Sequence, residues 1–124
     1  MTRKSLREVK EANRRIGHHW FSPATLEFFK SRVSETTYDG GDAGTVIVTS
    51  ECPPSGRRMW SVALASPTGE VNRLVDICSY ASDRQAHRGA VDAARLLSGG
   101  IDEDRVREYL IKHAGGEFAT GRRP

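Results

Sequence analysis

Few residues in this chain of 124 have the types and spacing that metal binding or catalysis requires. A zinc site needs several His, Cys or carboxylate side chains that reach one ion. His18 and His19 are adjacent, so their side chains point in different directions from any regular element. The other candidate ligands, Cys52, Cys78 and His87, are far apart, and no Cys-x-x-Cys or His-x-x-x-His spacing is present. We therefore predict that the protein binds no metal.

Covalent and acid–base catalysis have no stronger support in the sequence. Cys52 stands in a Pro-rich loop, and Cys78 closes an apolar segment where a small core residue fits. No Gly-x-Ser-x-Gly motif, phosphate-binding loop or dinucleotide fingerprint occurs. The acidic run Asp102-Glu103-Asp104 resembles paired catalytic carboxylates, but it also fits the capped start of a helix. We predict no catalytic residue, no cofactor and a protein that is not an enzyme.

Aromatic residues are concentrated in one short segment. Four of the six Phe and Trp residues stand within residues 20–29. Adjacent aromatic residues on a helix cannot all face the core, so an exposed Phe28 beside Lys30 and Arg32 could bind a protein or stack on nucleic-acid bases. The alternative is that these rings pack in the core. The candidate surface consists of Trp20, Phe28, Lys30 and Arg32.

Positive charge is concentrated near the N-terminus. The net charge is +3 and the sequence pI is about 9.1, yet residues 1–33 carry eight Lys and Arg against three Glu. Such a segment can attract phosphate, or it can simply be a solvated helix face. The candidate basic contacts are Arg7, Lys10 and Arg14, with Arg84 and Arg88 later in the chain.

Helix-start and helix-stop signals predict two helices in the first 33 residues. Ser5 and Glu8 match a capping box, after which Leu6, Val9, Ala12 and Ile16 recur at helical spacing until Gly17. Ser22-Pro23 is a typical helix start and predicts a second helix over about residues 23–33.

Two more helices are predicted near the C-terminus. Ser82 and Gln85 open a helix that Gly99-Gly100 closes, with an inward face of Ala86, Ala90, Ala93, Ala94 and Leu97. Asp102 caps the last helix, which runs to Gly115.

The middle of the chain changes to the alternation typical of strands. Strands are predicted at 45–49, 59–65 and 71–77, the last two as a hairpin around Ser66-Pro67-Thr68-Gly69, and residues 34–44 as a mobile acidic loop. The resulting order is α-α-β-β-β-α-α, which is an α+β fold with a three-stranded antiparallel sheet covered by helices. We expect one domain over residues 1–116 and a flexible tail over 117–124.

Several short motifs resemble those of a family of small, functionally uncharacterised proteins encoded by bacteriophages, prophages and plasmids. The matching residues are Asn13, His19-Trp20-Phe21, Ser31-Arg32-Val33, Thr49-Ser50-Glu51 and Trp60. The resemblance covers about residues 12–85. It implies an accessory protein of a mobile element and brings no catalytic residues with it.

The order helix, three antiparallel strands, helix also resembles that of double-stranded RNA-binding domains. The segment from Ser82 to Arg88 is similar to the start of their last helix, which implies that Arg84, His87 and Arg88 face phosphates. Asp83 departs from that pattern, because the family usually has a basic residue there.

Together these features predict a non-enzymatic accessory protein that modulates a host or phage protein by binding it. The alternative is a nucleic-acid-binding protein that contacts RNA or DNA. No apolar run approaches the length needed to span a bilayer, and no apolar segment follows the basic N-terminus. We therefore expect a cytoplasmic protein with no membrane partner.

Overall fold

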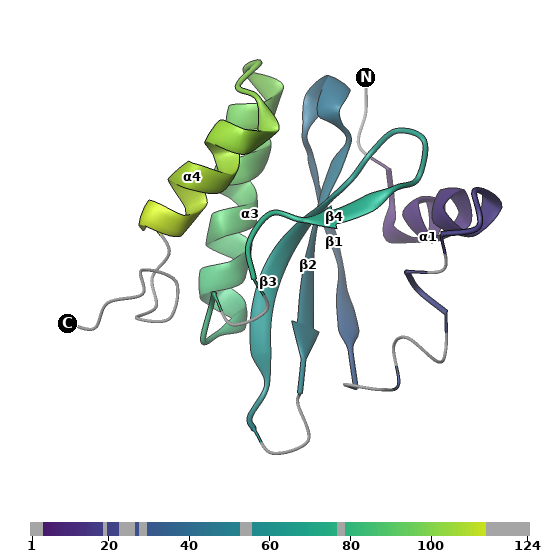
Figure 1. Ribbon diagram of the computed structural model, residues 1–124, viewed down its shortest axis with the longest axis horizontal. Coiled ribbons are helices and arrows are strands. Elements are labelled where there is room, and N and C mark those ends of the chain that lie inside the picture. Colours follow the sequence, from purple (N-terminus) through teal and green to yellow (C-terminus); the bar gives the residue numbers. More distant parts are fainter. Residues whose placement is uncertain are drawn as a thin grey trace.

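The computed structural model describes residues 4–18, 20–22, 27, 30–52, 56–76 and 79–113. Four strands form one antiparallel sheet in the order β1-β2-β3-β4, with α1 on one side and α3 and α4 on the other (Figure 1). The elements in chain order are α1 (Leu6–Arg15), β1 (Arg32–Asp39), the 3-10 helix η1 (Gly41–Ala43), β2 (Thr45–Glu51), β3 (Met59–Ala65), β4 (Val71–Arg73), α3 (Asp83–Ser98) and α4 (Glu103–His113).

The two central strands are buried on both faces. All seven residues of β2 are buried, and β3 is buried except for the partly exposed Trp60. Val46 and Val48 belong to the cluster that includes the inward face of α3, whereas Ile47 packs with Val9 of α1 on the opposite face. Helices therefore cover both faces of the sheet, whereas cover was expected on one face.

Helix α1 begins as predicted and ends one residue early. Ser5 Oγ accepts a hydrogen bond from the Glu8 N–H, and Glu8 Oε1 accepts one from the Ser5 N–H. Leu6, Val9 and Ala12 are buried, but Ile16 is 46% exposed. The prediction for Ile16 was wrong because this residue is the C-cap, and Asn13 continues the buried stripe instead.

Helices α3 and α4 confirm the predicted caps. Ser82 Oγ accepts from the Gln85 N–H, Gly99 is the C-cap of α3, and Asp102 Oδ1 accepts from the Arg105 N–H. The predicted inward residues Ala86, Ala90, Ala93, Ala94 and Leu97 are all buried.

The sheet has four strands, not the predicted three. The predicted acidic loop 34–44 contains most of β1 and all of η1, while Arg32 and Val33, assigned to a helix, begin β1. Lys30 has a φ of 52°, which ends helical backbone before this strand. β1 is an edge strand with mostly polar, exposed or half-buried residues, so its sequence lacks apolar alternation. Of the second predicted helix, residues 23–26, 28 and 29 lie outside the described residues.

The last strand is shorter than predicted. The β3–β4 hairpin is antiparallel as expected, but β4 ends at Arg73. Leu74 and Val75 are both buried in the cluster beneath α3. Successive residues of a strand point to opposite faces, so two inward-facing neighbours require the chain to bend. The predicted tail 117–124 lies outside the described residues.

Gly89 of α3 packs directly against Tyr80, so Gly89→Ala is expected to be destabilising. A Cβ at Gly89 would lie 2.3 Å from Tyr80 Oη and 2.8 Å from Cζ, and Tyr80 is 2% exposed. Because the Tyr80 ring is buried, the overpacked variant should lose about 1–3 kcal/mol in the free energy of unfolding, measured by chemical denaturation.

Gly99→Ala is the matched control. A Cβ at Gly99 would meet atoms no closer than 3.5 Å, and its φ of −83° suits any residue. Its stability should change by less than about 0.5 kcal/mol. Equal losses in both variants would contradict the close contact between Gly89 and Tyr80.

Candidate functional site

The buried side chain of Asn13 joins α1 to two other segments. Asn13 is 1% exposed; its Nδ2 donates to the Gly69 carbonyl at 2.8 Å and lies 3.0 Å from His18 Nδ1. Its Oδ1 accepts from the Trp20 N–H at 2.8 Å. Gly69 has a φ of 114°, and a Cβ there would lie 2.5 Å from the Ala12 carbonyl oxygen. The β3–β4 turn therefore packs against the backbone of α1, and the Asn13 side chain fixes the position of the Trp20 backbone N–H.

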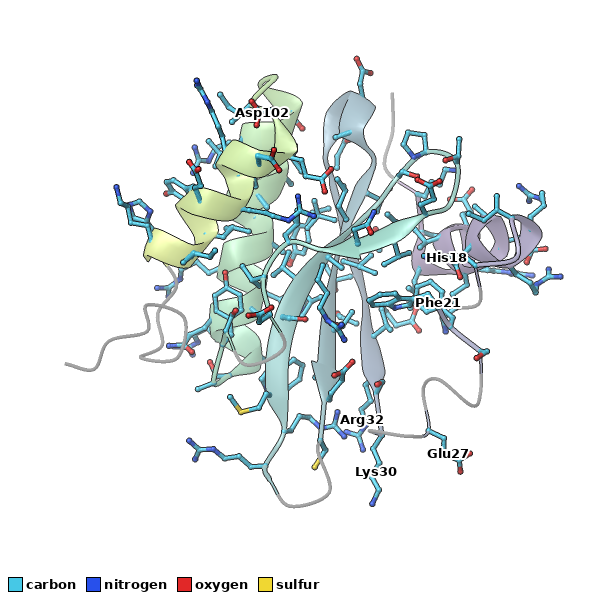
Figure 2. All side chains as sticks on the ribbon, in the orientation of Figure 1. His18, Phe21, Glu27, Lys30, Arg32 and Asp102 are labelled. Carbon is cyan, nitrogen blue, oxygen red and sulfur yellow. The ribbon has the colours of Figure 1, made fainter. Side chains whose placement is uncertain are left out.

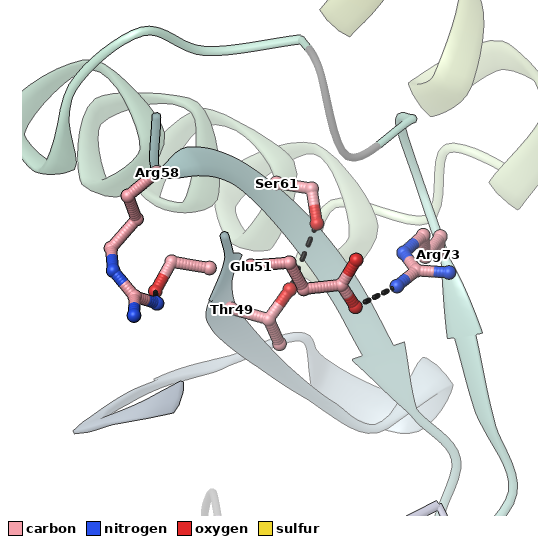
Figure 3. Close-up of polar contacts among 6 residues, drawn as sticks. Thr49, Glu51, Arg58, Ser61 and Arg73 are labelled. Carbon is pink, nitrogen blue, oxygen red and sulfur yellow. Dashed lines mark hydrogen bonds and ion pairs between the residues drawn. The ribbon is translucent and has the colours of Figure 1, made fainter. Parts of the chain in front are cut away.

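Trp20 leads from this contact to a polar cluster on the sheet. The Arg73 guanidinium carbon lies 5.1 Å from the centroid of the Trp20 ring, within range of a cation–π interaction. Arg73 pairs in turn with the Glu51 carboxylate (Figure 3). Beside this pair, Thr49 Oγ1 and Ser61 Oγ are 2.8 Å apart.

The ion pair stabilises the largely buried charge of the Glu51 carboxylate. Glu51 is 9% exposed, and an isolated carboxylate buried to that extent would be costly. Arg73 on β4 supplies the opposite charge. Its Nε has no hydrogen-bond partner in the part of the chain that the structure describes. The pair thus holds the end of β2 to β4 across β3.

The opposite face of the same sheet end is basic. Ser50 is paired in register with Arg32 on β1 and Trp60 on β3, and Ser50 Oγ accepts from Arg58 Nη1 at 2.8 Å. Lys30 and Arg32 lie at this end of the sheet, beyond α1, α3 and α4 (Figure 2). We call the four cationic residues here the basic end: Lys30, Arg32, Arg57 and Arg58.

The charges of the basic end are not compensated by ion pairs. Lys30, Arg32 and Arg57 are exposed and Arg58 is half-buried. None of the four forms an ion pair with any acidic residue among those described, including the exposed Glu27. The sheet therefore ends in a concentrated positive charge.

The predicted binding residues divide among three places. Lys30 and Arg32 belong to the basic end, while Trp20 is half-buried against the core, and Phe28 lies outside the described residues. Arg7, Lys10 and Arg14 are exposed on α1, and Arg84 and Arg88 are exposed on α3. Because α1 and α3 cover opposite faces of the sheet, the two helical sets do not form one surface.

His87 is held by neighbouring side chains. Tyr38 Oη lies 2.7 Å from His87 Nδ1, and His87 Nε2 lies 3.1 Å from Asp83 Oδ1. Partial burial, together with the Asp83 carboxylate, raises the pKa of the Tyr38 hydroxyl. This chain of contacts joins β1 to α3, so His87 is already engaged at the position where the RNA-binding resemblance would place a phosphate contact.

Sequence reasoning missed Arg57, Arg58 and Arg73. Arg73 looks like an ordinary outward-facing strand residue until pairing places it near Glu51. Arg57-Arg58 directly precedes β3, which was a usable signal, because a hairpin brings the start of β3 beside the end of β2. The predicted strands 45–49 and 59–65 imply that neighbourhood.

The described residues form neither a metal site nor a membrane-spanning helix. No three His, Cys, Asp or Glu residues among them lie close enough to hold a metal ion, and His19 and Cys78 fall outside the described set. Within the same set, no helix has the length and apolar character needed to cross a membrane.

A small cavity of about 80 Å³ lies between α3 and α4. Tyr80 lines it, and the buried Tyr80 Oη has no hydrogen-bond partner among the described residues. The lining residues are Tyr80, Gln85, Arg88, Gly89, Asp92, Tyr109, Leu110 and His113.

Residues 5–91 match the family of unknown function DUF7447, and the chain belongs to this family. The match contains the Asn13 contacts, the Glu51–Arg73 pair and the basic end, whereas α4 lies beyond it. The predicted membership of an uncharacterised family is confirmed. No curated protein and no solved structure matches the chain.

Tyr80→Phe is expected to change how stability depends on pH. Burial, with a smaller effect of the Asp92 carboxylate, raises the pKa of Tyr80 to about 12, against about 10 when unfolded. The unfolded chain ionises first, so stability from the neutral phenol is complete below pH 10 and is lost as pH rises toward 12. Between pH 9 and pH 12, the wild type should lose about 2–3 kcal/mol more than Tyr80→Phe, measured by chemical denaturation.

Below pH 9 the same variant should be as stable as the wild type or slightly more stable. It removes a buried hydroxyl that has no partner among the described residues. Parallel pH curves for the two proteins would show that the hydroxyl is not buried.

Glu51→Gln is expected to destabilise the protein by about 2 kcal/mol, because it leaves the half-buried Arg73 without its counter-charge. The double variant Glu51→Gln/Arg73→Gln should lose less than the sum of the two single variants, with a coupling of about 1 kcal/mol or more. Chemical denaturation of the four proteins measures this coupling.

The control pair is Glu11 and Arg14 on α1. Its side chains are more than half exposed, so Glu11→Gln should cost less than about 0.5 kcal/mol. Additive losses at Glu51 and Arg73 would mean that their ion pair does not stabilise the sheet end.

Proposed function

We propose that this protein is a non-enzymatic accessory protein of a bacteriophage, prophage or plasmid. It acts in the host cytoplasm by binding a host or phage macromolecule through the basic end of its sheet. The observation that carries the proposal is the set Lys30, Arg32, Arg57 and Arg58, which gathers four cations without an acidic partner among the described residues.

The anchoring of Arg32 and Arg58 to the paired strands supports a binding role. Arg32 stands on a strand paired with Ser50, and Ser50 holds Arg58. On the other face, the Glu51–Arg73 pair ties β2 to β4. Charged side chains on a rigid support lose less conformational freedom when they bind, so less of the interaction free energy is lost to ordering.

Two described groups suited to acid–base chemistry are engaged within the fold, which supports a stoichiometric role. Glu51 pairs with Arg73, and His87 contacts both Tyr38 and Asp83. Binding requires no free nucleophile or proton acceptor, and small accessory proteins of mobile elements commonly act by occupying a partner.

The aromatic docking surface expected from the sequence has less support than the charge. Trp20 is half-buried, packs against the core and lies over Arg73. A protein partner at the basic end would therefore be recognised chiefly through its own negative charge.

Affinity capture from host lysate tests the proposal. The wild type is compared with a basic-end variant, Lys30→Gln/Arg32→Gln/Arg57→Gln, and with an α1 variant, Arg7→Gln/Lys10→Gln/Arg14→Gln, that removes the same charge. Arg58 is left intact because it bonds Ser50. Each capture is made with and without nuclease treatment.

The wild type and the α1 variant should retain a common partner, whether protein or nucleic acid, and the basic-end variant should lose it. Circular dichroism and thermal unfolding check that all three proteins fold. Capture lost only in the α1 variant, or kept in both variants, would overturn the assignment of the basic end. A wild type that captures nothing would overturn the binding function.

A further inference from the structure

We infer that the partner at the basic end is a nucleic acid held through its phosphates. This inference rests on the proposed function and names the ligand of that site. It follows from the kind of cation present, the placement that the strands impose on these cations, and the absence of large exposed apolar residues beside them in the part of the chain that the structure describes.

Arginine dominates the basic end. Three of its four cations are Arg, whose planar guanidinium presents parallel N–H donors that match phosphate oxygens. Arg58 uses Nη1 to reach Ser50 Oγ at 2.8 Å, which orients the guanidinium and leaves its other donors for a ligand. A hydrogen bond to a neutral hydroxyl leaves the positive charge of Arg58 uncompensated.

The sheet holds these donors close together. Arg32 lies opposite Ser50 in the β1–β2 ladder, and adjacent strands are about 5 Å apart. Arg58 contacts the same Ser50 from the start of β3. Arg32 and Arg58 thus both lie next to Ser50, and Lys30 and Arg57 are their near neighbours in the chain, so several phosphates of one backbone can be contacted together.

The described residues around the basic end lack the apolar anchors that a protein interface needs at its centre. Stable protein interfaces bury apolar anchors within a polar rim. The large exposed apolar residues of the described chain lie elsewhere, at the end of α1, on α3, before α4 and on α4, and they are Ile16, Val91, Ile101 and Ile111. At the basic end, Met59 is buried and Trp60 is packed against the core. Charge is therefore the main recognition element.

The geometry also indicates that the basic end does not recognise base sequence. The four cations come from strand ends and the turns beside them, and none of them lies on α1, α3 or α4. Contacts to phosphate position a protein but carry no base sequence. We therefore expect binding that is independent of sequence and strongly dependent on salt.

Fluorescence anisotropy tests the inference with three labelled nucleic acids of mixed sequence. They are duplex DNA and duplex RNA of about 30 base pairs and single-stranded DNA of about 30 nucleotides. Four phosphate contacts predict a slope of log affinity against log salt of about −3.6 on duplex DNA, which is roughly a 100-fold loss between 50 and 200 mM salt. The basic-end variant should bind at least about 10-fold more weakly at 50 mM and have a slope smaller by about 2.7.

The α1 variant is the matched control and should keep both the affinity and the slope of the wild type. If the triple variant does not fold, Arg57→Gln alone, at an exposed position, should reduce the duplex slope by about 0.9. An equal loss in the α1 variant, or an unchanged slope in the basic-end variant, would overturn the inference.

The same proteins separate failure of the inference from failure of the proposed function. No binding of the wild type to any of the three nucleic acids at 50 mM salt overturns the inference. If lysate capture then retains a nuclease-resistant protein through the basic end, the partner is an acidic protein and the proposed function stands. If capture fails as well, both are overturned.

Discussion

Burial of β2 on both faces is the constraint on which the rest of the structure depends. Each face of this strand requires its own cover, so α1 and the α3–α4 pair must lie on opposite sides of the sheet. The polar residues of β2 must also be satisfied inside the protein. Thr45 accepts from the Lys4 N–H, Thr49 contacts Ser61, and Glu51 pairs with an arginine. The buried end of β2 therefore carries polar side chains, and the charge of its carboxylate is balanced by Arg73.

The motif residues that first suggest a function act mainly by holding this arrangement in place. Asn13 joins α1 to the β3–β4 turn and to Trp20, and the Trp20 ring lies over Arg73 beside Glu51. A single line of contacts thus runs from a helix to the end of the central strand. These residues hold the fold together at the end of the sheet. Of the four cations of the basic end, only Arg32 belongs to the family-like motifs.

Local signals predicted the parts of the fold that depend on local chemistry. The caps of α1, α3 and α4 need only a side chain and a nearby N–H, so Ser5, Ser82 and Asp102 were recognisable. The edge strand β1 was not, because half of its side chains face solvent and its sequence has no apolar alternation. Arg73 was missed because its role exists only once β4 lies near Glu51.

The two-sided cover also decides which basic residues can act together. Arg7, Lys10 and Arg14 on α1 are separated from Arg84 and Arg88 on α3 by the full thickness of the sheet. The end of the sheet is not divided in this way, because the strands extend past the helices there and bring cations from β1 and the start of β3 together (Figure 2). The basic residues of the first 33 positions are therefore divided by the fold: Lys30 and Arg32 lie with Arg58 near the end of β2, apart from the cations of α1.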